Sequence, residues 1–183
     1  WLRIGVSVDA LTAVALIMVT TTVSMIMVYS VGYHRWGAGP GSHPEKGKPN
    51  HDGIDPLFSR FFAFMSLFGG SMLILVVSDN LLTLFVGWEI MGLCSYLLIG
   101  FWYAKPSARA AAIKAFLTTR IGDVVMLLGL AYLYYLAGSL SYDVIFSEET
   151  LHLLTSTGTP FVGISAAVLI GLFLFFGTVG KSA

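Results

Sequence analysis

Four of the charged side chains that lie inside or at the end of long apolar stretches of this sequence are of types, and at places, that could do acid–base chemistry. They are Glu89, Arg120, Asp123 and Lys181. A charge at the centre of a membrane-spanning helix costs roughly 2.5 to 3.5 kcal/mol. If these stretches cross a membrane, we expect each charge to face a partner inside a helix bundle and to serve the transfer of protons or ions.

Glu89 is the strongest candidate, because it lies near the middle of its apolar stretch. Gly92 and Tyr96 follow it at helical spacing. The glycine would let another helix approach, and the phenol could donate a hydrogen bond to the carboxylate. The alternative is a structural glutamate that is permanently neutral or permanently paired.

Arg120 and Asp123 are three residues apart, so they share one face of a helix and can pair. This pair could take part in function, or it could be a self-neutralised pair that only fixes helix packing. Lys114 lies near the end of the same stretch. We expect its side chain to reach the membrane surface.

Lys181 directly follows the uncharged run 160–180. Burial disfavours the charged form of a lysine, which makes Lys181 a candidate proton site. Gly177 and Gly180 could break the helix just before it, as in the discontinuous helices of transporters. The alternative is a lysine at a helix end that reaches the membrane surface.

Composition identifies the kind of protein that positions these residues. Hydrophobic residues make up 56% of the 183, charged residues only 11%, and the mean hydropathy is +0.83. Too few polar side chains exist to cover the surface of a soluble protein. The formal net charge is zero, which gives no sign of a nucleic-acid partner, and the single cysteine, Cys94, cannot form a disulfide within the chain.

About five apolar stretches are long enough to cross a bilayer, which takes about 20 residues. We therefore predict an all-α polytopic transmembrane helix bundle, in which Asp79-Asn80 links two spans as a tight hairpin. Proline after a capping residue, at Asp55-Pro56 and Thr159-Pro160, is typical of helix starts. The predicted spans cover residues 8–33, 56–78, 80–103, 107–137 and 160–183.

The basic residues gather on one side of this predicted bundle. That side would hold Arg35, Lys46, Lys48, Arg60, Lys105 and Arg109, and the other side only Arg3. Basic loops stay in the cytoplasm, so we expect loop 34–55 to be cytoplasmic and loop 138–159 to be periplasmic. The chain begins at Trp1 and stops just after an apolar run, so we expect an internal fragment of a longer protein.

Several segments together resemble a known family. The residues Gly-Trp-Glu-Ile-Met-Gly-Leu-Cys-Ser-Tyr-Leu-Leu-Ile-Gly-Phe-Trp-Tyr (87–103) are similar to the largest antiporter-like membrane subunit of respiratory complex I. This is subunit L of the bacterial NADH–quinone oxidoreductase and subunit 5 in mitochondria. The similarity continues in Ser-Arg-Phe-Phe-Ala-Phe (59–64), Thr-Arg-Ile-Gly-Asp (119–123) and Gly-Lys-Ser-Ala (180–183).

The resemblance implies a fold with inverted helix repeats and roles for the four charges. Glu89 and Lys181 would form a buried pair on a proton pathway, and Arg120 and Asp123 would serve coupling. Quinone reduction elsewhere in the complex would drive proton transfer. NADH, FMN, iron–sulfur clusters and quinone would bind to other subunits, leaving this chain without a redox site or a metal.

The resemblance also implies a location and leaves alternatives. We expect an integral protein of the bacterial plasma membrane, or of an organelle inner membrane, with other complex I subunits, lipid and protons as partners. The related alternatives are the large subunit of a multisubunit cation/proton antiporter and a subunit of a membrane-bound hydrogenase. Two unrelated alternatives are a passive membrane scaffold and, more distantly, a water-soluble enzyme.

Overall fold

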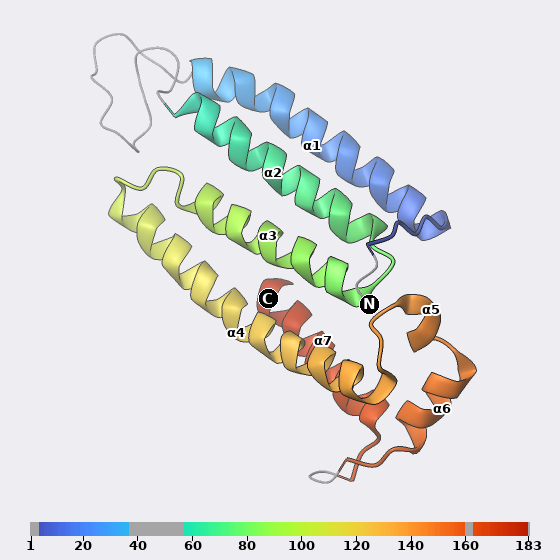
Figure 1. The fold of residues 1–183 in the computed structure, drawn as a ribbon. Coiled ribbons are helices and arrows are strands. Elements are labelled where there is room, and N and C mark those ends of the chain that lie inside the picture. Colours follow the sequence, from blue (N-terminus) through green and yellow to red (C-terminus); the bar gives the residue numbers. More distant parts are fainter. Residues whose placement is uncertain (1–3, 37–56, 160–162, 183) are drawn as a thin grey trace. The chain divides into compact units, whose positions relative to one another are not determined.

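Every regular element in the computed structural model is a helix, within the residues it describes, 4–36, 57–159 and 163–182 (Figure 1). Helices α1 to α4 are long and apolar enough to cross a membrane, and α7 is a shorter apolar helix. The predicted all-α membrane fold is therefore confirmed. The helices are α1 (Ala10–Trp36), α2 (Phe58–Val77), α3 (Leu81–Ile99), α4 (Pro106–Ala137), α5 (Tyr142–Ile145), α6 (Glu148–Ser156) and α7 (Ala166–Ser182).

The last helix begins later than its apolar sequence suggests. It starts at Ala166 and not at Pro160, which lies outside the described residues, as do Pro56 and most of loop 34–55. The chain folds back on itself first, because Thr159 N donates to Ile164 O and Ala166 N donates to Thr157 O, at 2.9 Å each. Segment 138–159 also contains two short helices, α5 and α6, where the sequence suggested only a loop.

The chain divides into two compact units. The first, here called the α1–α3 unit, comprises Ser7–Val77 and Val86–Phe116. The second, the α4–α7 unit, comprises Trp1–Val6, Ser78–Phe85 and Leu117–Ala183. Helices α3 and α4 contribute residues to both units.

Single glycines allow the helices of the α1–α3 unit to pack. A Cβ atom at Gly69 of α2 would lie 3.1 Å from Val23 Cγ1 of α1. A Cβ atom at Gly87 of α3 would lie 3.0 Å from Ser71 O of α2. The hairpin predicted from the short link between α2 and α3 is therefore present. Cys94 of α3 is fully buried, which fits its expected role as a small core residue.

Asp9 caps the start of α1. Its Oδ1 accepts a hydrogen bond from Thr12 N at 2.6 Å, which satisfies one of the free N–H groups of the first helical turn. The hydrogen bonds from Thr12 hold the pKa of Asp9 below its usual value of 3.8, so the cap stays charged at neutral pH.

The core of the α4–α7 unit lies where α4 and α7 meet the two short helices. Leu133, Ile145, Leu154, Ala166 and Ile170 are all buried and in contact. Helix α4 ends at Ala137, and the next residue, Gly138, has a φ of +69°, the left-handed conformation that lets a glycine terminate a helix. At the start of α6, Ser147 Oγ accepts from Thr150 N, in the manner of a helix cap.

Asp79 joins three segments within the α4–α7 unit. Its Oδ1 accepts from Gly5 N at 3.1 Å and from Asn80 Nδ2 at 2.7 Å. Its main-chain oxygen accepts from Tyr142 N at 3.2 Å. The link between α2 and α3 is therefore tied to residues before α1 and to the start of α5.

Candidate functional site

Helices α4 and α7 pack closely along one face, and their backbones meet at Gly122 and Gly180. A Cβ atom at Gly122 would lie 3.1 Å from Gly180 Cα, and one at Gly177 would lie 2.7 Å from Met126 Cβ. One at Gly129 would lie 2.8 Å from Phe173 Cβ. We call this contact the glycine seam. Residue numbers rise along α4 as they fall along α7, so the two helices run antiparallel.

The seam corrects one prediction from the sequence. Gly177 and Gly180 do not break α7, which is helical from Ala166 to Ser182. Their lack of a side chain instead lets α4 approach, as small residues do between membrane helices. The signal was present in the sequence, because Gly122 and Gly129 are seven residues apart and so lie on nearly the same face of α4.

Arg120 and Asp123 are brought together beside the seam, as their spacing predicted. Arg120 Nη1 lies 3.7 Å from Asp123 Oδ2. The Asp123 side chain is only 3% exposed, whereas that of Arg120 is 30% exposed. The carboxylate is thus enclosed and the guanidinium reaches toward the outside of the unit. A buried carboxylate needs such a positive partner because the interior stabilises an isolated charge poorly.

Lys181 lies at the end of α7 and interacts electrostatically with the same two charges. It directly follows Gly180, whose backbone contacts Gly122, the neighbour of Asp123. The charged groups that act on it are the carboxylate of Asp123, which attracts the ammonium, and the guanidinium of Arg120, which repels it. Lys181 is partly buried. The α4–α7 unit therefore gathers three of the four predicted site residues into one charge cluster.

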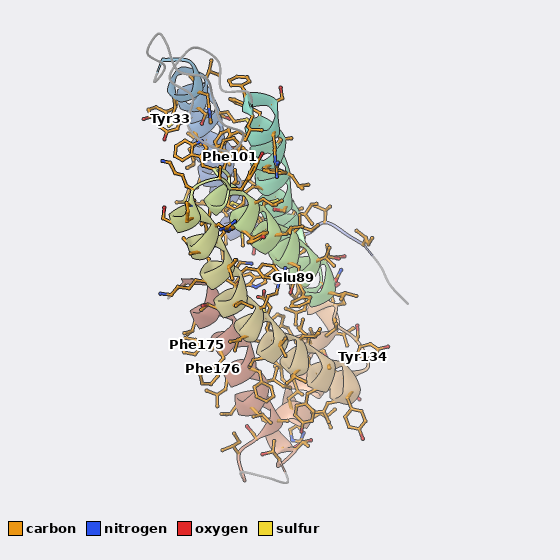
Figure 2. The ribbon with its side chains drawn as sticks, turned by 90° about the vertical axis from the view of Figure 1, so that its left-hand side faces the viewer. Tyr33, Glu89, Phe101, Tyr134, Phe175 and Phe176 are labelled. Atoms are coloured by element: carbon orange, nitrogen blue, oxygen red, sulfur yellow. The ribbon has the colours of Figure 1, made fainter. Side chains whose placement is uncertain are left out.

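Glu89, the fourth predicted residue, belongs to the α1–α3 unit. It lies at the middle of α3 and is partly buried (Figure 2). The expected pairing of Glu89 with Lys181 involves residues of both units and stays a prediction. Lys114 of α4 also belongs to the α1–α3 unit and is exposed.

The chemistry that this cluster offers is proton exchange, because it places a lysine near a carboxylate. The Asp123 carboxylate attracts the Lys181 ammonium, and Arg120 lies within 3.7 Å of the same carboxylate. Among the described residues, His, Cys, Asp and Glu side chains form no group that could hold a metal ion. The sequence alone indicated these charges. It did not indicate the hydrogen bonds of Asp79, which was expected only as part of a short link between two spans.

Comparisons with known proteins place the chain in a family. Residues 78–183 match the family model described as NADH:quinone oxidoreductase/Mrp antiporter, TM. Residues 1–36 match the model described as NADH-Ubiquinone oxidoreductase (complex I), chain 5 N-terminus. The matched regions contain all four site residues.

Named relatives agree with the family models. NADH-quinone oxidoreductase subunit L of Rhodobacter capsulatus is 44% identical over 98% of the chain. NAD(P)H-quinone oxidoreductase subunit 5, chloroplastic, of Mesostigma viride is 41% identical over 100% of the chain. The chain spans 24% of the length of each. It belongs to the NADH:quinone oxidoreductase/Mrp antiporter family of transmembrane proteins.

Proposed function

We propose that this chain supplies part of the proton pathway in the antiporter-like membrane subunit of an NADH:quinone oxidoreductase. The observation that carries the proposal is the charge cluster of Arg120, Asp123 and Lys181, which lies beside the glycine seam on the apolar helices α4 and α7. A polypeptide with a passive structural role has no need of a lysine beside an enclosed carboxylate that already has an arginine partner.

The chemistry proposed for the cluster is a change in how tightly Lys181 holds its proton. When Asp123 attracts the ammonium, the protonated form is favoured. When Arg120 draws the carboxylate to itself, that attraction weakens and Lys181 releases its proton more readily. Glu89 is the proposed second carboxylate, which would stabilise protonated Lys181 from the α1–α3 unit.

We propose that the cofactors and the quinone of the complex bind to other subunits. NADH, FMN, iron–sulfur clusters and quinone would bind there, and the energy of quinone reduction would reach this subunit through motion of charged groups. Its proposed partners are the other membrane and peripheral subunits, the lipid bilayer and protons. The proposed location is the bacterial plasma membrane.

The test uses the full-length subunit assembled in its complex, in inverted membrane vesicles. We expect Lys181→Met to abolish most NADH-driven proton uptake, because Met has a similar shape but cannot carry a proton. Lys181→Arg, which keeps the charge but does not deprotonate in proteins, should also fail to restore uptake. Electron transfer from NADH to an artificial acceptor measures assembly, and it should be unchanged in both variants.

Two outcomes would contradict the proposal. Normal proton uptake in Lys181→Met would reduce the cluster to a structural role. A second candidate function is favoured by the family description, which also covers Mrp antiporters. Proton movement that follows an imposed sodium or potassium gradient, and not NADH, would assign the chain to a cation/proton antiporter instead.

A further inference from the structure

An apolar groove is open along the α1–α3 unit. Its volume is about 590 Å³, inside the range of about 300 to 1,000 Å³ found for sites that hold small molecules. Helices α1, α2 and α3 each form a wall, represented by Ile26, Met65 and Leu98. Ile26 is 39% exposed and Met18, also in the α1 wall, is 65% exposed, so the groove opens to the outside of the unit.

The three walls lead to one cluster of aromatic rings. Tyr33 follows Ile26 by seven residues on α1 and Phe61 precedes Met65 by four on α2, so each continues the face of its wall. Trp102 lies three residues after the end of α3 at Ile99. The Tyr33 and Trp102 rings stack at 6.3 Å, and the His34 ring lies 4.5 Å from that of Phe61. Figure 2 shows Tyr33 and Phe101 at this same end. Aromatic rings of this kind collect where a membrane meets water.

Two cations lie over aromatic rings at this end of the unit, one over Trp102 of the cluster and one over the neighbouring Tyr103. Lys105 Nζ lies 4.8 Å from the centre of the Trp102 ring. Arg60 Cζ lies 5.6 Å from the centre of the Tyr103 ring. The arrangement combines an apolar channel with positive charge at one end, which complements a molecule with an apolar tail and an anionic head.

Trp102 adds a hydrogen-bond donor at the same place. Its Nε1 is buried, and no acceptor for it exists in the described part of the chain. A buried indole N–H usually has a partner. An anionic oxygen placed near Lys105 could fill that role.

We propose that the groove binds an acyl chain of an anionic phospholipid, whose phosphate contacts Lys105 and accepts a hydrogen bond from Trp102 Nε1. A transmembrane helix of another protein that fills the apolar walls with apolar side chains alone would bring no anion to Lys105, whereas the phosphate of a phospholipid supplies both an anion and an acceptor for Trp102. The expected cytoplasmic side of loop 103–109 agrees, since anionic lipids are concentrated in the cytoplasmic leaflet. This inference rests on the membrane location and not on the proton-transfer role.

The test is photo-crosslinking with the full-length subunit in its assembled complex. The complex is placed in phosphatidylcholine vesicles that contain phosphatidylglycerol with a photoreactive group in one acyl chain. We expect label on the α1 and α2 walls of the groove. Unlabelled phosphatidylglycerol should compete with the probe, and phosphatidylcholine should not.

Point variants distinguish the contribution of the headgroup contacts to probe binding from that of the apolar groove. Lys105→Gln should weaken binding of the probe about tenfold, as expected for loss of one charge-assisted hydrogen bond. Trp102→Phe, which keeps an aromatic ring but lacks the N–H, should weaken it less. Arg109→Gln removes an exposed charge from the same basic region and should leave binding unchanged. Thr22→Phe, which fills the groove, should remove the label while Lys105 stays in place.

The proposal is overturned if phosphatidylcholine competes as well as phosphatidylglycerol, because the headgroup contacts would then have no role. It is equally overturned if Lys105→Gln and Arg109→Gln bind the probe alike. Absence of label from the groove in the wild-type complex, with crosslinks to a neighbouring subunit's helix there, would assign the groove to a protein partner.

Discussion

The two units use glycine differently where their helices meet. In the α1–α3 unit a glycine on one helix faces a side chain or a carbonyl of the next, as Gly69 faces Val23 and Gly87 faces Ser71. In the α4–α7 unit Gly122 and Gly180 face each other, so the two backbones touch. The first arrangement coexists with an open groove of about 590 Å³, and the second encloses the carboxylate of Asp123.

This difference follows from what holds helices together in a membrane. Lipid tails are as apolar as leucine, so helices associate through close packing and polar contacts. Close packing over two turns of α4, with the two backbones in contact at Gly122, excludes lipid and leaves a protected place for charge. Contacts that rest on single glycines hold helices together but leave apolar surface open to lipid.

The largest effect is expected from removing the enclosed carboxylate of the α4–α7 unit. Asp123→Ala leaves Arg120 and Lys181 without their shared negative partner. Breaking a buried ion pair by removing one side costs about 3 to 5 kcal/mol, and the partial exposure of Arg120 places this case at or below the low end of that range. We expect the amount of assembled complex in membranes to fall steeply, as measured by native gel electrophoresis.

The double variant Arg120→Ala/Asp123→Ala is the control for this prediction. Removing both partners also removes one of the positive charges left unbalanced, so the double variant should assemble better than Asp123→Ala alone. If the double variant assembles worse, by the sum of the two single losses, Arg120 and Asp123 do not act as a pair.

A smaller effect is expected from separating the two backbones of the glycine seam. Gly122→Leu would push a side chain against Gly180, where the neighbouring atoms are backbone and cannot turn aside. Overpacking of this kind typically costs about 1 to 3 kcal/mol. The expected result is a lower melting temperature of the assembled complex and reduced proton uptake.

Gly171→Leu is the matched change on α7, because a Cβ atom at Gly171 would meet nothing within 4 Å. It should leave the melting temperature and proton uptake unchanged. Equal losses in Gly122→Leu and Gly171→Leu would show that glycine matters for α4 and α7 individually and not for their contact.

The sequence could predict the charges and the helices better than their contacts. Long apolar stretches identify α1 to α4, and the spacing of Arg120 and Asp123 alone predicts their pairing, because both depend on residues near each other in the chain. The resemblance was also sufficient to point to the family. The start of α7 at Ala166 could not be predicted in this way. Hydrogen bonds between residues 157–159 and 164–166 determine that start, and the apolar character of the sequence does not reveal these bonds.

The glycines show the same limit at the site. Gly177 and Gly180 suggested a broken helix because glycine is a poor helix former. Their actual role depends on Gly122, more than 50 residues earlier in the chain. A search for glycines at matching helical positions on two spans would have found the seam, but only with a reason to pair α4 with α7.

The smallest effect is expected at Asp79, where the α4–α7 unit depends on hydrogen bonds and not on helix contact. Asp79→Ala removes the acceptor for Gly5 N, and an unsatisfied, partly buried N–H costs about 1 kcal/mol. Hydrogen–deuterium exchange of the assembled complex should become faster at Gly5. Tyr142 N, which donates to the main-chain oxygen of Asp79, is an internal reference that should change little. Asp79→Asn keeps an acceptor oxygen and should exchange like the wild type. If exchange at Gly5 is equally fast in the Asn and Ala variants, the charge of Asp79, and not its hydrogen bond, ties residues 4–6 to the link between α2 and α3.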